Sequence, residues 1–239
     1  MRWRSRPTAW SESVADPACS PAFLFDLDGV VVDSNALHVA SWREVARRHG
    51  FACSDPEHIG KCGLRTTAVI RDLLRWPVSA ADAERIGFEK EEIYRGWIRA
   101  DGLPAIPGVQ AFLAEANQLG IPCAVGSSAP RENVDACLRA LALESAFRAT
   151  VSGADVARGK PAPDIFLKAA AALGVAPERC LVFEDAPAGI AAAHAAGMRA
   201  WALRTSHAPE ELAEADVVVD DFAALSPRAV QAAWTPRPS

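Results

Sequence analysis

Short apolar runs and stretches with apolar residues every three or four positions alternate along most of the chain. The runs predict strands, and the periodic stretches predict helices. The predicted strands end near residues 25, 125, 152, 183, 203 and 219. The predicted helices between them are Gly108–Leu119, Asn133–Leu143, Pro163–Leu173 and Ala186–Ala196. This alternation predicts an α/β fold, in which a parallel sheet carries helices on both faces.

The stretch between Ser34 and Leu103 has a different pattern, because it contains no convincing strand. Its periodicity predicts three helices, at Ala36–Gly50, Arg65–Trp76 and about Ala80 to Ile98. We therefore expect an all-helical insertion over residues 35–103 and a Rossmann-like core over 21–34 and 104–239. Residues 1–20 are predicted to form a mobile tail, and 236–239 to fray.

Composition narrows the class of protein. The 239 residues suit one large or two unequal domains, and the net charge of −5 argues against nucleic-acid binding. No apolar run is long enough for a membrane span, and the first twenty residues lack a secretory apolar stretch. The cysteines are scattered without a C-x-x-C pair, which favours free thiols in a reducing cytoplasm. We expect a cytoplasmic monomer or weak dimer.

The first predicted strand ends in two carboxylates, Asp26 and Asp28, followed by Gly29. Alternation places both on one side of an extended chain unless the turn has already begun. Carboxylates held this close repel each other unless a divalent cation or a shared proton compensates. The structural alternative is a capped turn between strand and helix, where Asp is common.

Two further predicted strands end in the polar groups Gly126–Ser128 and Glu184–Asp185, and the short strand near Val151 leads through Ser152–Asp155 to Gly159–Pro161. The carboxyl ends of parallel strands share one edge of a sheet, so these groups are expected to converge there. Carboxylate oxygens suit Mg²⁺, while a hydroxyl and an ammonium suit phosphoryl oxygens. The combination indicates phosphoryl transfer.

Four motifs carry a family resemblance: FDLDGV at 25–30, GSS at 126–128, GKPAPD at 159–164 and FEDAPAGI at 183–190. With these in order, the chain resembles the haloacid dehalogenase superfamily over roughly residues 22–221. It is most similar to the branch that contains beta-phosphoglucomutase and sugar-phosphate phosphatases. The resemblance implies that the insertion over 35–103 is a helical cap.

The resemblance also implies roles for the acidic residues. Asp26 would be the nucleophile that becomes an aspartyl phosphate, and Asp28 would protonate the leaving oxygen. Mg²⁺ would be held by Asp26, the main-chain carbonyl of Asp28, and Asp185, with Glu184 acting directly or through water. A helix N-cap and first-turn acid is the alternative reading of Glu184 and Asp185.

Phosphate binding is implied for Ser127, Ser128 and Lys160, against the alternatives of an N-cap and a solvated loop lysine. Within the cap, His38, Arg65 and Lys90 match positions that orient the general acid or bind the non-reacting part of the substrate. Each has an ordinary alternative, as a packing histidine or a surface charge.

The chain departs from the mutase pattern after the GSS motif. A polar, basic run grips the second phosphate in the mutase, and here Ser128-Ala129-Pro130-Arg131-Glu132-Asn133 stands instead. Arg131 or Asn133 is the candidate replacement, and the spacing between Gly63 and Arg65 differs by one.

These observations favour a Mg²⁺-dependent phosphatase acting on a small phosphorylated metabolite, such as a sugar or polyol phosphate. The alternatives are a beta-phosphoglucomutase-like mutase and an inactive binding protein of the same fold. Carbon–phosphorus cleavage would need a Schiff-base lysine in the cap, where Lys61 and Lys90 lie outside any such motif.

Overall fold

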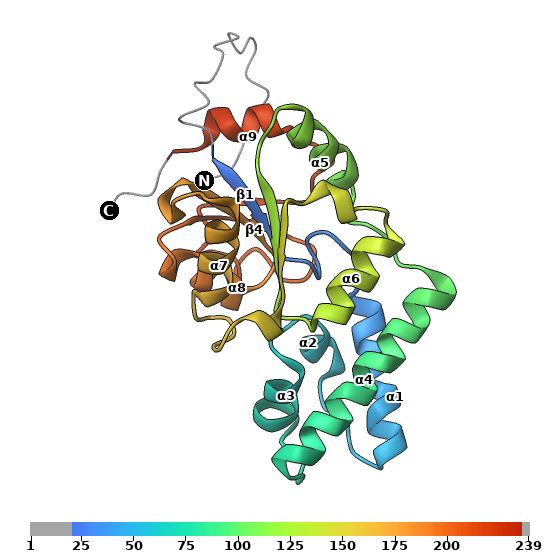
Figure 1. Cartoon of the computed structure of the whole chain (residues 1–239). Coiled ribbons are helices and arrows are strands. Elements are labelled where there is room, and N and C mark those ends of the chain that lie inside the picture. The colour runs from blue at the N-terminus through green and yellow to red at the C-terminus, as the bar shows by residue number, and fades with distance from the viewer. Residues whose placement is uncertain (1–20, 236–239) are drawn as a thin grey trace.

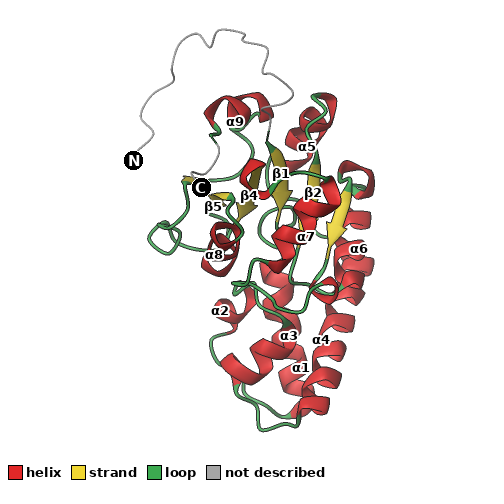
Figure 2. Cartoon of the chain, turned by 60° about the vertical axis from the view of Figure 1, so that its left-hand side comes forward, coloured by secondary structure: helices red, strands yellow, loops and turns green. Residues whose placement is uncertain are grey.

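The computed structural model describes residues 21–235, and the predicted tail and frayed end lie outside this range. Its centre is a six-stranded parallel sheet with the strand order β3-β2-β1-β4-β5-β6 (Figures 1 and 2). The strands are β1 (Ala22–Phe25), β2 (Cys123–Gly126), β3 (Ala149–Val151), β4 (Cys180–Glu184), β5 (Arg199–Leu203) and β6 (Val217–Val219). The predicted α/β fold with a parallel sheet is confirmed.

Helices cover both faces of this sheet because alternate side chains of each strand point to opposite faces. In β1, Phe23 and Phe25 pack into one apolar cluster, whereas Leu24 packs into another. The first cluster includes side chains of α5 (Val109–Gln118), α6 (Arg131–Ala140) and α9 (Pro227–Ala233). The second includes side chains of α7 (Asp164–Leu173) and α8 (Pro187–Ala195). The central strands are therefore buried on both sides.

The stretch between β1 and β2 is helical and encloses a third apolar cluster of its own. It consists of α1 (Asn35–His49), α2 (Pro56–Gly60), α3 (Thr66–Ala68), the π-helix η2 (Val69–Leu74) and α4 (Ala80–Asp101). Figure 1 shows these helices below the sheet, at the end where its strands point. Trp42, Ile70 and Ile86 are among the side chains that hold them together.

Two details differ from the sequence-based expectation. The predicted helix from Arg65 to Trp76 is a short α-helix that runs into the π-helix η2. Val69 and Ile70 are buried in η2, and adjacent apolar residues can share a buried face in an α-helix as well, so apolar spacing does not distinguish the two forms. The helices α2 and α9 were not predicted, because five and seven residues are too few for a clear periodicity.

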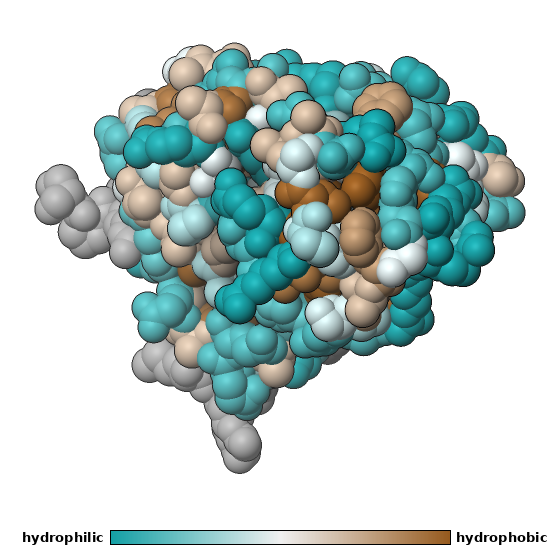
Figure 3. All heavy atoms as spheres, turned by 90° about the horizontal axis from the view of Figure 1, so that it is seen from below, coloured by the Kyte–Doolittle hydropathy of each residue, from teal (hydrophilic) through white to brown (hydrophobic). Residues whose placement is uncertain are grey.

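Within residues 21–235, no helix has both the length and the apolar character needed to cross a bilayer. Seen from the end formed by the inserted helices, the surface is mostly hydrophilic, with apolar side chains gathered in its middle (Figure 3). None of the five described cysteines forms a disulfide.

Gly108, which precedes α5, packs closely against the backbone of Phe222 and Ala223. Both Gly108 and Gly120 have a positive φ, of 80° and 72°, which L-residues adopt at a cost of roughly 1–2 kcal/mol. A Cβ on Gly108 would also lie 2.5 Å from the Phe222 carbonyl carbon and against the backbone nitrogen of Ala223. We expect Gly108→Ala to lower the free energy of unfolding by about 1–3 kcal/mol more than Gly120→Ala.

Urea unfolding of both variants measures this difference. Gly120→Ala is the matched control, because a Cβ there has no neighbour within 4 Å. Equal losses in the two variants would show that the contact between Gly108 and the 222–223 backbone does not constrain the fold.

Candidate active site

The ends of β1, β2 and β4 lie side by side and bring the predicted polar groups together. Asp26 continues the sheet by one residue, since its N–H donates to the Phe183 carbonyl at 2.9 Å. The chain then turns at Gly29, where φ is 73°. A Cβ on Gly29 would lie 2.6 Å from Cγ of Asp185, so the absence of a side chain lets the end of β4 approach the turn.

A buried ammonium links two of the strand ends. Nζ of Lys160 lies 2.9 Å from Oδ1 of Asp26 and 2.6 Å from Oε1 of Glu184, and these three side chains are almost completely buried. The other Glu184 oxygen accepts the N–H groups of Asp185 and Ala186, at 2.7 and 2.8 Å. Glu184 thus accepts two main-chain N–H groups just before α8 and also holds Lys160, while its predicted role at a metal ion stays a prediction.

Three buried carboxylates lie close to one another beside the Lys160 ammonium. Asp26, Glu184 and Asp185 each offer an oxygen, and these oxygens all lie within 4.8 Å of one another. Burial raises the pKa of Asp26 to about 7, with Lys160 opposing the shift and Glu184 and Asp28 adding to it. Burial, followed by the charges of Glu184 and Asp26, also raises the pKa of Asp185.

The Lys160 ammonium alone leaves this cluster with excess negative charge. A divalent cation would compensate the charge, and a set of carboxylate oxygens is what Mg²⁺ prefers. The residues therefore fit such an ion. The Asp28 carboxylate is not part of this cluster, since it turns toward the inserted helices.

Every hydrogen bond that the described residues make to the Asp28 carboxylate reaches the same oxygen. Oδ1 accepts from Ser34 Oγ at 2.6 Å, from His38 Nε2 at 3.0 Å and from the Tyr94 hydroxyl at 3.4 Å. Burial raises the pKa of Asp28, but His38, Ser34 and Lys90 outweigh it and lower the pKa to about 2. Oδ2 is left as the oxygen that can exchange a proton with a ligand in the adjoining cavity.

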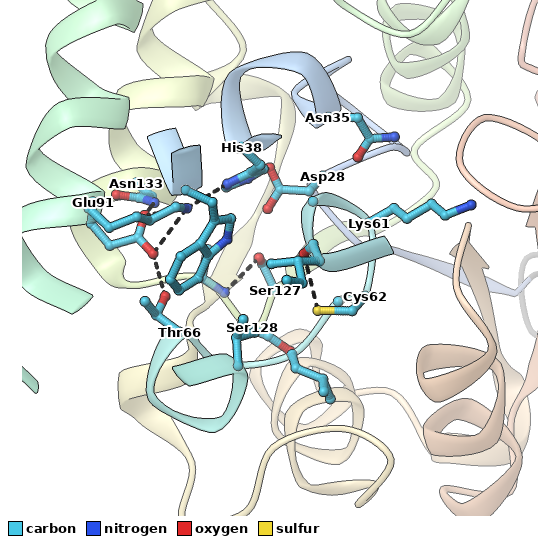
Figure 4. Close-up of a pocket in the computed structure, with 18 of the residues that line it drawn as sticks. Asp28, Asn35, His38, Lys61, Cys62, Thr66, Glu91, Ser127, Ser128 and Asn133 are labelled. Carbon is cyan, nitrogen blue, oxygen red and sulfur yellow. Dashed lines mark hydrogen bonds and ion pairs between the residues drawn. The ribbon is translucent and has the colours of Figure 1, made fainter. Parts of the chain in front are cut away.

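His38 and Lys90 form a chain of hydrogen bonds that ends on Asp28. Figure 4 shows His38 beside Asp28. Lys90 is 2% exposed, and its Nζ donates to Nδ1 of His38 at 2.7 Å. Because an ammonium only donates, Nδ1 accepts and the imidazole proton lies on Nε2, where it donates to Asp28. Both residues thus act on Asp28 from the inserted helices, and neither is a surface group.

A second buried network adjoins this chain and was not predicted. Glu91 lies 3.3 Å from Lys90 Nζ, and it accepts hydrogen bonds from Asn133 Nδ2 at 2.7 Å and from Thr66. Arg95 donates to the Asn133 oxygen at 2.6 Å. A sequence signal existed, since Glu91 and Tyr94 follow Lys90 by one and four residues on one predicted helix.

Two of the predicted phosphate-binding residues, Ser127 and Ser128, border a cavity of about 60 Å³ that Asp26, Asp28 and Asp185 also line, whereas Lys160 does not line it. Ser127 is buried, and its Oγ accepts the N–H of Ala129 at 3.1 Å, so its own proton can be donated to a ligand. Ser128 also lines the cavity, and its buried hydroxyl has no hydrogen-bond partner among the described residues.

Two cationic residues of the inserted segment, Arg65 and Lys61, behave differently from His38 and Lys90. Arg65 does not line this cavity, and its guanidinium donates to the carbonyls of Gly153, Val156 and Ala157. It therefore ties the inserted helices to the loop after β3. Lys61 does line the cavity, and Figure 4 shows its side chain extending away from Asp28.

The loop after β5 also supports the site, and the sequence offered no motif for it. His207 Nδ1 donates to the main-chain carbonyl of Asp185 at 2.9 Å. Asn35 Nδ2 donates to Ser206 Oγ at 2.7 Å. These contacts fix the turn that carries Asp185 and connect it to the start of α1.

Comparisons with known proteins agree with this arrangement. Residues 21–197 match the family model of haloacid dehalogenase-like hydrolases. The chain is 33% identical over 209 residues to validoxylamine A 7'-phosphate phosphatase of Streptomyces hygroscopicus subsp. limoneus, covering 83% of this chain and 92% of that protein. It is 34% identical over 200 residues to hexitol phosphatase A of Escherichia coli, covering 82% and 89%.

A solved structure shows the same fold. The beta-phosphoglucomutase of Clostridium difficile superimposes with a TM-score of 0.78 at 26% identity, covering 89% of this chain and 96% of that one. Phosphatases and a mutase are thus both among the similar proteins. The match over 21–197, together with the four motifs at the strand ends, places the chain in the haloacid dehalogenase-like hydrolase family, as a phosphatase-type enzyme.

Proposed function

We propose that the protein is a Mg²⁺-dependent phosphatase that removes phosphate from a small phosphorylated sugar or polyol through an aspartyl-phosphate intermediate. The observation that carries the proposal is the placement of Asp26. Its carboxylate is buried beside Lys160 and two further carboxylates, and it borders the same cavity as Asp28 and Ser127. The phosphatases among its relatives support this substrate class.

In the first step, an Asp26 oxygen forms a bond to phosphorus while the bond from phosphorus to the substrate oxygen breaks. Lys160 and the Ser127 hydroxyl would balance charge on the phosphoryl oxygens. Mg²⁺, held by Asp26, Asp185 and the Asp28 carbonyl with Glu184 beside them, would lower the pKa of Asp26 and neutralise developing charge. Ser128 adds a further donor beside the same cavity.

Asp28 handles the proton in both steps. A phosphoryl dianion entering the cavity adds negative charge beside Asp28, so its pKa rises and Oδ2 takes up a proton. That proton passes to the leaving oxygen as the bond to phosphorus breaks. Asp28 then accepts a proton from the water that attacks the intermediate, which releases phosphate and restores Asp26.

The inserted helices would serve as a cap. We propose residues 35–103 as a cap domain over a core domain made of 21–34 and 104–239. The cap supplies His38 and Tyr94 to the Asp28 oxygen, and it supplies Lys90 to His38. Such a cap excludes bulk water from a reactive acyl phosphate until the leaving group departs.

The contacts of Arg131 and Asn133 favour a phosphatase over a mutase. Arg131 donates to Asp155 at 2.5 Å and to the Thr150 carbonyl at 3.0 Å. Asn133 is 1% exposed, and its side-chain amide donates to Glu91 and accepts from Arg95. Because both candidate replacements are already engaged, neither is available to hold the second phosphate that a mutase must keep in place.

The central test follows two products from one reaction. With Mg²⁺, we expect phosphate release from sugar and polyol phosphates, and phosphate without glucose 6-phosphate from beta-glucose 1-phosphate with a bisphosphate primer. Asp26→Asn should lower kcat by more than about a thousandfold, because the nucleophile is lost. Asp33→Asn is the matched control, since Asp33 is exposed and seven residues away.

Two results would contradict the proposal. Glucose 6-phosphate with little free phosphate would make the enzyme a mutase. Phosphate release that persists in Asp26→Asn would remove the aspartyl-phosphate mechanism.

Asp28→Asn tests the proton transfer through its dependence on the leaving group. We expect kcat for a sugar phosphate to fall by roughly 10²–10⁴-fold, because its alkoxide needs a proton. The rate of aspartyl-phosphate formation from p-nitrophenyl phosphate should fall less, since nitrophenolate leaves without a proton. Burst kinetics isolates this first step, and equal losses for the two substrates would exclude the proposed role.

The acidic cluster predicts stabilisation by Mg²⁺ itself. At one hundred times its dissociation constant, Mg²⁺ should stabilise the fold by about 2.7 kcal/mol, measured as a rise in Tm. Asp185→Asn should reduce this rise, whereas Asp33→Asn should leave it intact. An equal rise in all three proteins would place the ion elsewhere, independently of any activity assay.

A further inference from the structure

A second cavity, of about 280 Å³, opens beside the catalytic one. The two cavities share four lining residues, which are Thr66, Glu91, Ser128 and Pro130. The catalytic cavity, at about 60 Å³, has room for roughly four waters at about 15 Å³ each, enough for a phosphoryl group and little more. Since ligand pockets usually span about 300–1,000 Å³, the leaving group is expected to extend into the second cavity.

The charges around the second cavity disfavour another phosphate there. Glu84, Glu91 and Glu132 line it, against two arginines, Arg65 and Arg95. Both arginines are already engaged, Arg65 with main-chain carbonyls and Arg95 with Asn133 and Glu92. An anionic group would therefore meet three carboxylates and two guanidinium groups, of which Arg65 keeps one buried N–H, at Nε, without a partner. The lining suits a neutral group that carries hydroxyls.

An aromatic side chain lies at this cavity. Phe88 is 65% exposed, the most exposed of the large apolar side chains described, and it lines the second cavity. The Arg95 guanidinium carbon lies 5.9 Å from its ring centre, which limits where the ring can move. An exposed aromatic face beside carboxylates can pack against the apolar face of a sugar ring while the carboxylates accept from its hydroxyls.

Ser128 lies where the two cavities meet, because it lines both of them. Its hydroxyl is buried and has no partner among residues 21–235. A buried hydroxyl without a partner is unfavourable, so a ligand oxygen at this junction would satisfy it.

From these observations we propose that the second cavity is a subsite for a neutral second sugar ring. The preferred substrate is then a disaccharide-sized phosphomonoester with its phosphate at Asp26 and its far ring against Phe88. This inference rests on the proposed phosphatase function and specifies its substrate class.

The test compares kcat/KM for trehalose 6-phosphate and sucrose 6-phosphate with that for glucose 6-phosphate. We expect the disaccharide phosphates to be better by at least about tenfold, the effect of burying roughly 50 Å² more apolar surface. Phe88→Ala, and Ala154→Trp, which places a large side chain at an exposed position lining the second cavity, should each reduce this preference about tenfold, mainly through KM.

Two further variants sharpen the comparison. Phe88→Tyr should keep the preference, since it retains the ring. Leu167→Ala is the matched control, because Leu167 is also an exposed apolar residue, at 38%, and lines neither cavity. It should leave the preference unchanged.

The outcomes separate the two proposals. A wild-type enzyme that hydrolyses p-nitrophenyl phosphate but does not favour disaccharide phosphates would overturn the subsite and leave the phosphatase standing. A preference that survives both Phe88→Ala and Ala154→Trp would also overturn the subsite. If neither p-nitrophenyl phosphate nor any of the sugar phosphates is hydrolysed with Mg²⁺, the phosphatase proposal fails and the subsite fails with it.

Discussion

One buried ammonium faces three buried carboxylates in this protein, and the rest of the site is arranged around that imbalance. Lys160 pairs with Asp26 and Glu184, while Asp185 stands beside them. Burying unpaired charge is costly, so either a bound cation or protonation of the carboxylates must compensate the excess negative charge. The sheet supplies the rigidity that holds these groups together, because β1 and β4 are adjacent and buried on both faces.

The carboxylates are not equivalent, and their surroundings separate their roles. Burial raises the pKa of Asp26, whereas donors on one oxygen of the more exposed Asp28 hold its pKa low. A bound cation would therefore stabilise the ionised form of Asp26, whereas the negative charge of an incoming phosphoryl group would raise the pKa of Asp28. Environments that separate the pKa values of two neighbouring carboxylates in this way are typical of sites with distinct nucleophile and acid–base roles.

The sequence predicted the convergence of the strand ends but not the packing of the inserted helices. Asp26, Ser127, Lys160 and Asp185 could be placed because parallel strands end at one edge. The chain from Lys90 through His38 to Asp28 depends on how α1 packs against α4, which periodicity does not specify. Arg65 shows the same limit: its guanidinium binds the carbonyls of 153, 156 and 157, contacts that no local pattern encodes.

The contacts of Asp28 imply that its chemistry depends on where the inserted helices sit. Ser34 precedes α1, His38 lies in α1 and Tyr94 lies in α4, so three donors from the 34–94 stretch meet one oxygen. Moving these helices away from the sheet would remove donors from Oδ1 and raise the pKa of Asp28. Arg65 opposes that movement through its bonds to the loop after β3. Proton transfer and exclusion of water would then be linked through one set of contacts, because the helices that cover the cavity also orient its acid.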